Sequence, residues 1–78
     1  LPADINKLFD AAIEAAKEKR YEVLVECCQA INRWFNFPEP NENVRDAEIP
    51  GGMYTNMIAQ LKGLKLDHLM DRVLKMVP

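Results

Sequence analysis

The chain is poor in the residues that build catalytic, redox and metal sites. Its 78 residues include one histidine and two cysteines, and Cys27 and Cys28 are adjacent. Neighbouring side chains on a helix diverge, so these thiols are poorly placed to bridge each other, and no CxxC spacing is present. We interpret them as buried thiols in a reducing cytoplasm. Without a Ser-His-Asp arrangement or a P-loop, we expect no catalytic, cofactor-binding or metal-binding residue.

An excess of either charge is also missing. The sequence has 10 basic and 12 acidic residues, a net charge of -2, which argues against the clustered basic footprint of a nucleic-acid-binding domain. No run of 18 apolar residues occurs, so we expect no membrane contact by this segment. The start shows no signal peptide and no initiator methionine, from which we expect a processed or excised cytoplasmic fragment.

Apolar side chains at helical spacing are what the chain has in quantity. Hydrophobic residues make up 49% of the sequence, and only three glycines interrupt it. A domain of this size buries only about 60% of its unfolded surface. The many apolar side chains therefore either pack in an efficient core or contact a partner. We predict an all-α fold, a single helical domain or fragment of about four helices over residues 1–78.

Two helical patterns fill residues 1–35. Apolar residues recur every three or four positions over 4–19, with Asp4 as the expected N-cap, and again over 21–35. No glycine or proline separates the patterns, so one long helix and a hairpin that breaks near Arg20 both stay open. The usual helix length of about 8–20 residues favours the break. An aromatic cluster, interpreted as core, ends this part: Trp34, Phe35 and Phe37.

The polar side chains that could bind a metal or act in catalysis have simpler interpretations. Four carboxylates repeat at intervals of four, as in di-metal bundles, but no Glu-x-x-His motif accompanies them, so we predict a solvated face: Glu14, Glu18, Glu22 and Glu26. The single histidine, His68, has only Asp71 within helical reach, and two groups do not make a metal site. We predict an exposed helix residue there.

A long irregular stretch and a helical hairpin are predicted for the second half. Residues 36–52 hold three prolines and several asparagines, so no helix crosses them. Residues 53–78 form an antiparallel pair of helices joined by a short connection. In this pair we expect Thr55 to cap the first helix, Gly63 to close it as the C′ residue, and Asp67 to cap the second.

The most informative string is EIPGGMYTNMIAQLKGLKLDHLMDRVLKMV, from Glu48 to Val77. It resembles the segment that follows the TIM barrel in biotin-dependent carboxyltransferases, where a motif close to E-[IM]-P-G-G-x-x-[TS]-N-[LM] precedes a helix. That family comprises pyruvate carboxylase, including its separate B subunit, and the alpha subunit of oxaloacetate decarboxylase. Met53 is similar to the residue of the decarboxylase alpha and separate-subunit forms, whereas residues 1–40 match only loosely.

The resemblance implies a role without catalysis. In the family this extension packs on the barrel and helps to form a funnel to the site where carboxyl passes between biotin and pyruvate or oxaloacetate. It implies a TIM-barrel partner holding a divalent metal, a biotin carrier domain and a homo-oligomer, in a lyase or ligase. By resemblance, the loop that shapes the funnel comprises Pro50, Gly51, Gly52, Thr55 and Asn56.

A second interpretation rests on the apolar excess alone. An independent helical interaction module would bind an amphipathic partner helix in a groove. Methionines suit adaptable surfaces, and this interpretation expects them there: Met53, Met57, Met70 and Met76. A free-standing enzyme has almost no support in the sequence, and the choice between carboxylase and decarboxylase parents stays open.

Overall fold

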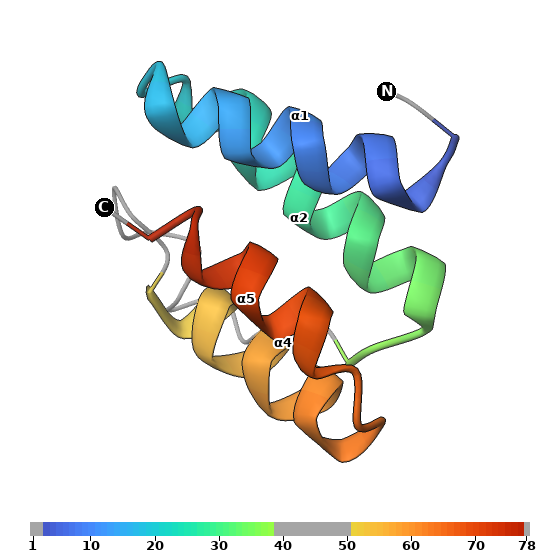
Figure 1. Ribbon diagram of the computed structural model, residues 1–78. Coiled ribbons are helices and arrows are strands. Elements are labelled where there is room, and N and C mark those ends of the chain that lie inside the picture. The colour runs from blue at the N-terminus through green and yellow to red at the C-terminus, as the bar shows by residue number, and fades with distance from the viewer. Residues whose placement is uncertain (1–2, 39–50, 78) are drawn as a thin grey trace.

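Four α-helices make up the fold of the computed structural model, which describes residues 3–38 and 51–77. Along the chain they are α1 (Ile5–Lys17), α2 (Tyr21–Phe35), α4 (Gly51–Gly63) and α5 (Asp67–Leu74), and no strand occurs in the described ranges. Figure 1 shows α1 lying along α2 and α4 lying along α5. The all-α class predicted from the periodicity is therefore confirmed. None of the described helices combines the length and apolarity needed to cross a membrane.

The start of α1 follows the predicted capping. One carboxylate oxygen of Asp4 accepts the backbone N–H groups of Asn6 at 2.8 Å and Lys7 at 3.2 Å. These are two of the donors that the first turn of a helix leaves without an internal partner. The first predicted helix is confirmed, with its last residue at Lys17.

The break between α1 and α2 lies near Arg20, as the helical-hairpin alternative predicted. Lys19 has a left-handed φ of 59°, and the N–H of Arg20 returns to the carbonyl of Ala15 at 2.8 Å. This six-to-one bond is the mark of a Schellman motif, which ends a helix without glycine at the cost of a strained lysine. Residues 1–35 therefore contain two helices.

The same motif corrects the predicted end of α4. Gly63 is the last helical residue, and Lys65, two positions later, takes the left-handed conformation at φ 60°. The N–H of Leu66 then bonds to the carbonyl of Leu61 at 3.0 Å. The C′ position belongs to Lys65, so the prediction for Gly63 was wrong. Asp67 is likewise the first residue of α5 and makes no cap, since Leu66 holds that position without a side-chain bond.

Replacing Gly63 by alanine is expected to raise the free energy of unfolding by about 0.5–1 kcal/mol, because glycine is a poor helix former. A Cβ built at this position meets no atom within 4 Å. Lys65→Gly is expected to stabilise by a similar amount, since glycine adopts positive φ without strain. Urea denaturation measures both. A destabilising Gly63→Ala would instead place the left-handed residue at Gly63.

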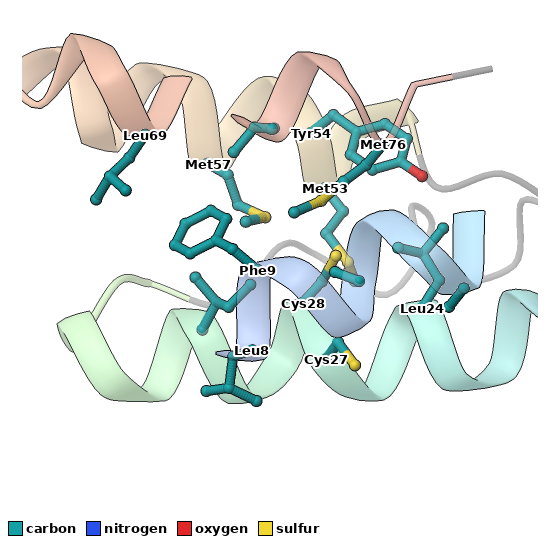
Figure 2. Close-up of a cluster of buried hydrophobic side chains, with 14 of the residues drawn as sticks. Leu8, Phe9, Leu24, Cys27, Cys28, Met53, Tyr54, Met57, Leu69 and Met76 are labelled. Carbon is teal, nitrogen blue, oxygen red and sulfur yellow. The ribbon is translucent and has the colours of Figure 1, made fainter. Parts of the chain in front are cut away.

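The core lies between the two helix pairs. Fully buried side chains of α1 and α2 include Phe9, Leu24 and Cys28, and three buried methionines lie in α4 (Met53 and Met57) and just after α5 (Met76). Figure 2 shows Met53, Met57 and Met76 reaching from the α4–α5 side toward Phe9 and Cys28. We call this contact zone the methionine seam and define it by those five residues. Met53, Met57 and Met76 are therefore core, which contradicts the expectation that they line an adaptable surface, and Met70 is partly buried against that core.

One arginine joins the two pairs by polar contacts. Arg72 of α5 donates to the side-chain oxygen of Asn6 at 2.9 Å, to its backbone carbonyl at 2.8 Å, and to Asp10 at 2.6 Å. Its guanidinium also lies 4.9 Å from the ring centroid of Phe9. Since its partners lie more than 60 positions away, no local pattern in the sequence indicated this contact.

A buried amide interrupts the apolar interior. The Asn32 side chain is 2% exposed, and neither its oxygen nor its nitrogen has a hydrogen-bond partner. Burial of an unpaired amide costs about 1–3 kcal/mol.

Asn32→Leu keeps the number and branching of side-chain heavy atoms while removing the unpaired polar groups. We expect it to raise the free energy of unfolding by about 1 kcal/mol, and Asn32→Asp to lower it by more than that, since an unpaired charge is buried. Thermal and urea unfolding followed by circular dichroism measure both. A clear loss of stability in Asn32→Leu would mean that the amide is paired in solution.

Candidate functional site

The candidate site is the first half of α4, where most of the residues named by resemblance lie. Gly51 and Gly52 open the helix, and no described glycine has a positive φ. The predicted helix start after Gly52 was therefore late, and these glycines are helical. Pro50 falls outside the described residues. Thr55, expected as the N-cap, is an exposed residue inside the helix.

Asn56 has the most informative contact of this group. It is half-buried, and its side-chain nitrogen donates to the backbone carbonyl of Pro38 at 3.1 Å. Pro38 lies just beyond the end of α2, so the bond connects α4 to the first helix pair. The amide is thus engaged within the molecule, where it links α4 to the segment after α2.

The side chains next to these residues point inward. Met53 is 1% and Tyr54 4% exposed, and the Tyr54 hydroxyl has no hydrogen-bond partner. Burial, followed by the nearby Cys28 and Tyr21, raises the pKa of Tyr54 to about 12. A neutral phenol with so high a pKa is a poor proton donor near neutral pH. This face of α4 is therefore part of the core.

The cysteines have the environment that the sequence predicted. Both are free and fully buried. Burial, and then the neighbouring Cys27, raises the pKa of Cys28 to about 12. Burial is also the main cause that raises the pKa of Cys27, with Glu26 next. Because the thiolate is the nucleophile, neither thiol is activated for attack.

Predicted surface residues are exposed, with no metal-site geometry among the residues described. The four ladder glutamates and His68 are all exposed, as expected. An open hollow of about 350 Å³ lies against α2, lined by Tyr21, Glu22, Val25 and Glu26. Within residues 3–38 and 51–77, no three His, Cys, Asp or Glu side chains converge as a metal site requires.

The aromatic cluster at the end of α2 differs from its prediction in one residue. Phe35 stacks on Phe37 with ring centroids 4.9 Å apart, and Trp34 meets Phe35 edge-on at 5.0 Å. Phe35 and Phe37 are half-buried against the core, but Trp34 is 54% exposed. Trp34 lies in the last turn of α2, and the prediction that it is a core residue was wrong.

Comparison with known proteins assigns the C-terminal part of the chain. The family model described as the conserved carboxylase domain matches residues 44–78, a span that includes all of α4 and α5. Neither the curated proteins nor the solved structures gave a match to the chain. The family resemblance predicted from the string that begins at Glu48 is thus confirmed for this segment. Residues 44–78 are therefore similar to the conserved carboxylase domain of the oxaloacetate decarboxylase alpha and pyruvate carboxylase family.

Proposed function

We propose that the chain is a helical, non-catalytic portion of a biotin-dependent carboxyltransferase and shapes the funnel that leads to the active site of its barrel. The observation that carries the proposal is the conserved carboxylase domain over residues 44–78. The funnel-shaping residues would be Pro50, Gly51, Gly52, Thr55 and Asn56. The transfer itself would take place on the barrel, between biotin and pyruvate or oxaloacetate.

The geometry of Asn56 supports a shaping role. Its bond to Pro38 ties the family-matched helix α4 to the segment after α2. Thr55, the next residue toward the helix start, is exposed. A helix that lines a funnel has to be held to the rest of the molecule, and this bond supplies one such contact.

The partners and cofactors of this function lie outside the described helices. They are a TIM barrel with its divalent metal, a biotin carrier domain, and further copies in a homo-oligomer in the cytoplasm. No described cluster of side chains has the arrangement to hold a metal. The parent acts as a carboxylase or a decarboxylase on its keto acid substrate.

Complementation tests the proposal. A pyruvate carboxylase-type barrel that lacks its conserved carboxylase domain is mixed with the chain, and oxaloacetate decarboxylation is followed. We expect the chain to be inactive alone and to raise the activity of the barrel. Asn56→Ala is expected to remove most of that gain, whereas the exposed Lys62→Ala retains it. Activity of the chain alone, or complementation unaffected by Asn56→Ala, would contradict this role.

The alternative is an independent helical module that binds an amphipathic helix. The observation in its favour is a set of exposed large apolar side chains: Trp34, Leu64, Leu74 and Val77. The burial of Met53, Met57 and Met76 counts against it, because these were its expected adaptable surface. Binding of a basic or neutral amphipathic peptide without binding to the barrel would favour the alternative.

A further inference from the structure

The two helix pairs are unequally connected. Within each pair the backbones run close together, whereas across the pairs α5 approaches α1 over a shorter stretch. Figure 1 shows the α4–α5 pair lying across the α1–α2 pair as a separate layer. The space between the layers is filled by long side chains of the methionine seam.

The composition of the seam favours adjustment. Methionine has three rotatable side-chain bonds and a polarisable sulfur, and it keeps contact while its neighbours shift. The seam has no polar group that fixes a register. That function falls to Arg72, which holds Asn6 and Asp10 from α5, while Asn56 tethers α4 to Pro38.

We propose that the methionine seam is a sliding and opening plane, along which the α4–α5 pair moves as a unit against the α1–α2 pair, with Arg72 as the latch. Packed helix layers shift in this way in shear motions, and local opening involves cooperative units of a fold. The device adds to the proposed function and does not depend on it: the family-matched pair changes its position while the other pair keeps its structure.

The two adjacent cysteines report on different interfaces. Cys28 is directed toward the α4–α5 pair beside Met53, whereas Cys27 is directed away from that pair (Figure 2). Since Cys27 is fully buried and α1 is the described helix that packs along α2, Cys27 reports on the α1–α2 contact. Opening of the seam would expose Cys28 and leave Cys27 covered.

Thiol labelling with Ellman's reagent in native buffer tests the proposal. Two variants, Cys27→Ala and Cys28→Ala, leave one thiol each, and the rates are normalised to those of the urea-unfolded chains. We expect Cys28 to react at least about tenfold faster than Cys27. This ratio corresponds to an opening of the seam that is about ten times more populated than the globally unfolded state. Equal normalised rates would show that both thiols are exposed only by global unfolding, and would overturn the proposal.

The latch is tested in the same assay. Arg72→Gln is expected to raise the Cys28 rate by a further factor of about ten while leaving the Cys27 rate unchanged. Arg72→Lys keeps the charge, and we expect its Cys28 rate to fall between those of the native chain and of Arg72→Gln. Lys75→Gln, at an exposed position three residues after Arg72, is the control. Unchanged Cys28 labelling in Arg72→Gln, or a parallel rise of both thiols, would overturn the role of Arg72. If that variant does not fold, the ratio in the native chain decides alone.

Discussion

Phe9→Ala is expected to lower the free energy of unfolding by about 3–5 kcal/mol, the usual cost of deleting a fully buried phenylalanine. The Phe9 side chain is completely buried and lies in the methionine seam, beneath Arg72. It therefore fills space between the two helix pairs, and its loss leaves a cavity that rigid helices close only in part. Small domains have total stabilities of about 5–15 kcal/mol, so this loss is a large fraction of the total. Urea denaturation followed by circular dichroism measures the loss.

Trp34→Ala provides the matched control for Phe9→Ala. Tryptophan is the larger side chain, but Trp34 is 54% exposed and touches the cluster by one edge-on contact to Phe35. We expect a loss of about 1 kcal/mol or less, the size of one aromatic pair. A loss in Trp34→Ala equal to that in Phe9→Ala would contradict the described position of the core.

Arg72→Met is expected to cost about 2 kcal/mol, the second largest effect. Methionine keeps the apolar length of the side chain but removes three hydrogen bonds to Asn6 and Asp10, two of them to neutral acceptors. Hydrogen bonds to charged groups contribute about 1.5–3 kcal/mol, and the lower part of that range applies because the Asp10 side chain is 73% exposed. Equilibrium unfolding in urea at low and high salt measures the effect.

The double variant locates the interaction. Arg72 lies over Phe9, so the two substitutions are coupled. We expect the stability loss of the double variant to be smaller than the sum of the two single losses by about 0.5–1 kcal/mol. Asp10→Asn should cost less than 1 kcal/mol, since an amide oxygen still accepts from the guanidinium. Strict additivity, or a loss in Asp10→Asn equal to that in Arg72→Met, would mean that Arg72 acts elsewhere.

Local signals in the sequence predicted the helices well. Periodic apolar residues located α1, α2, α4 and α5, and the short polar side chain of Asp4 identified the start of the first. These features depend on residues within four positions of each other, which a sequence reader sees directly. The buried cysteines and exposed glutamates followed from the same periodicity.

Features that depend on distant residues or on strained backbone were missed. Lys19, Asn36 and Lys65 adopt positive φ at three helix ends, although lysine has no intrinsic preference for it. Arg72 finds its partners only when α5 packs on α1. Whether Trp34 is covered depends on neighbouring elements and not on its own helix, so its exposure was not predictable.

The family resemblance of the second half was predicted from the sequence, whereas the backbone form at the start of α4 was predicted only in part. The resemblance over the string from Glu48 to Val77 agrees with the family match over residues 44–78. The glycines were interpreted as a loop because glycine is a turn residue, yet Gly51 and Gly52 form the first turn of α4. Nothing local indicated that Asn56 would bond to Pro38, which lies 18 positions earlier.

Direct association with a carboxyltransferase barrel tests the central claim. Isothermal titration of the 78-residue chain into a pyruvate carboxylase-type barrel that lacks this domain should give saturable one-to-one binding, weakened in Asn56→Ala. Absence of binding by a chain shown to be folded by circular dichroism would contradict a role as scaffold for the barrel.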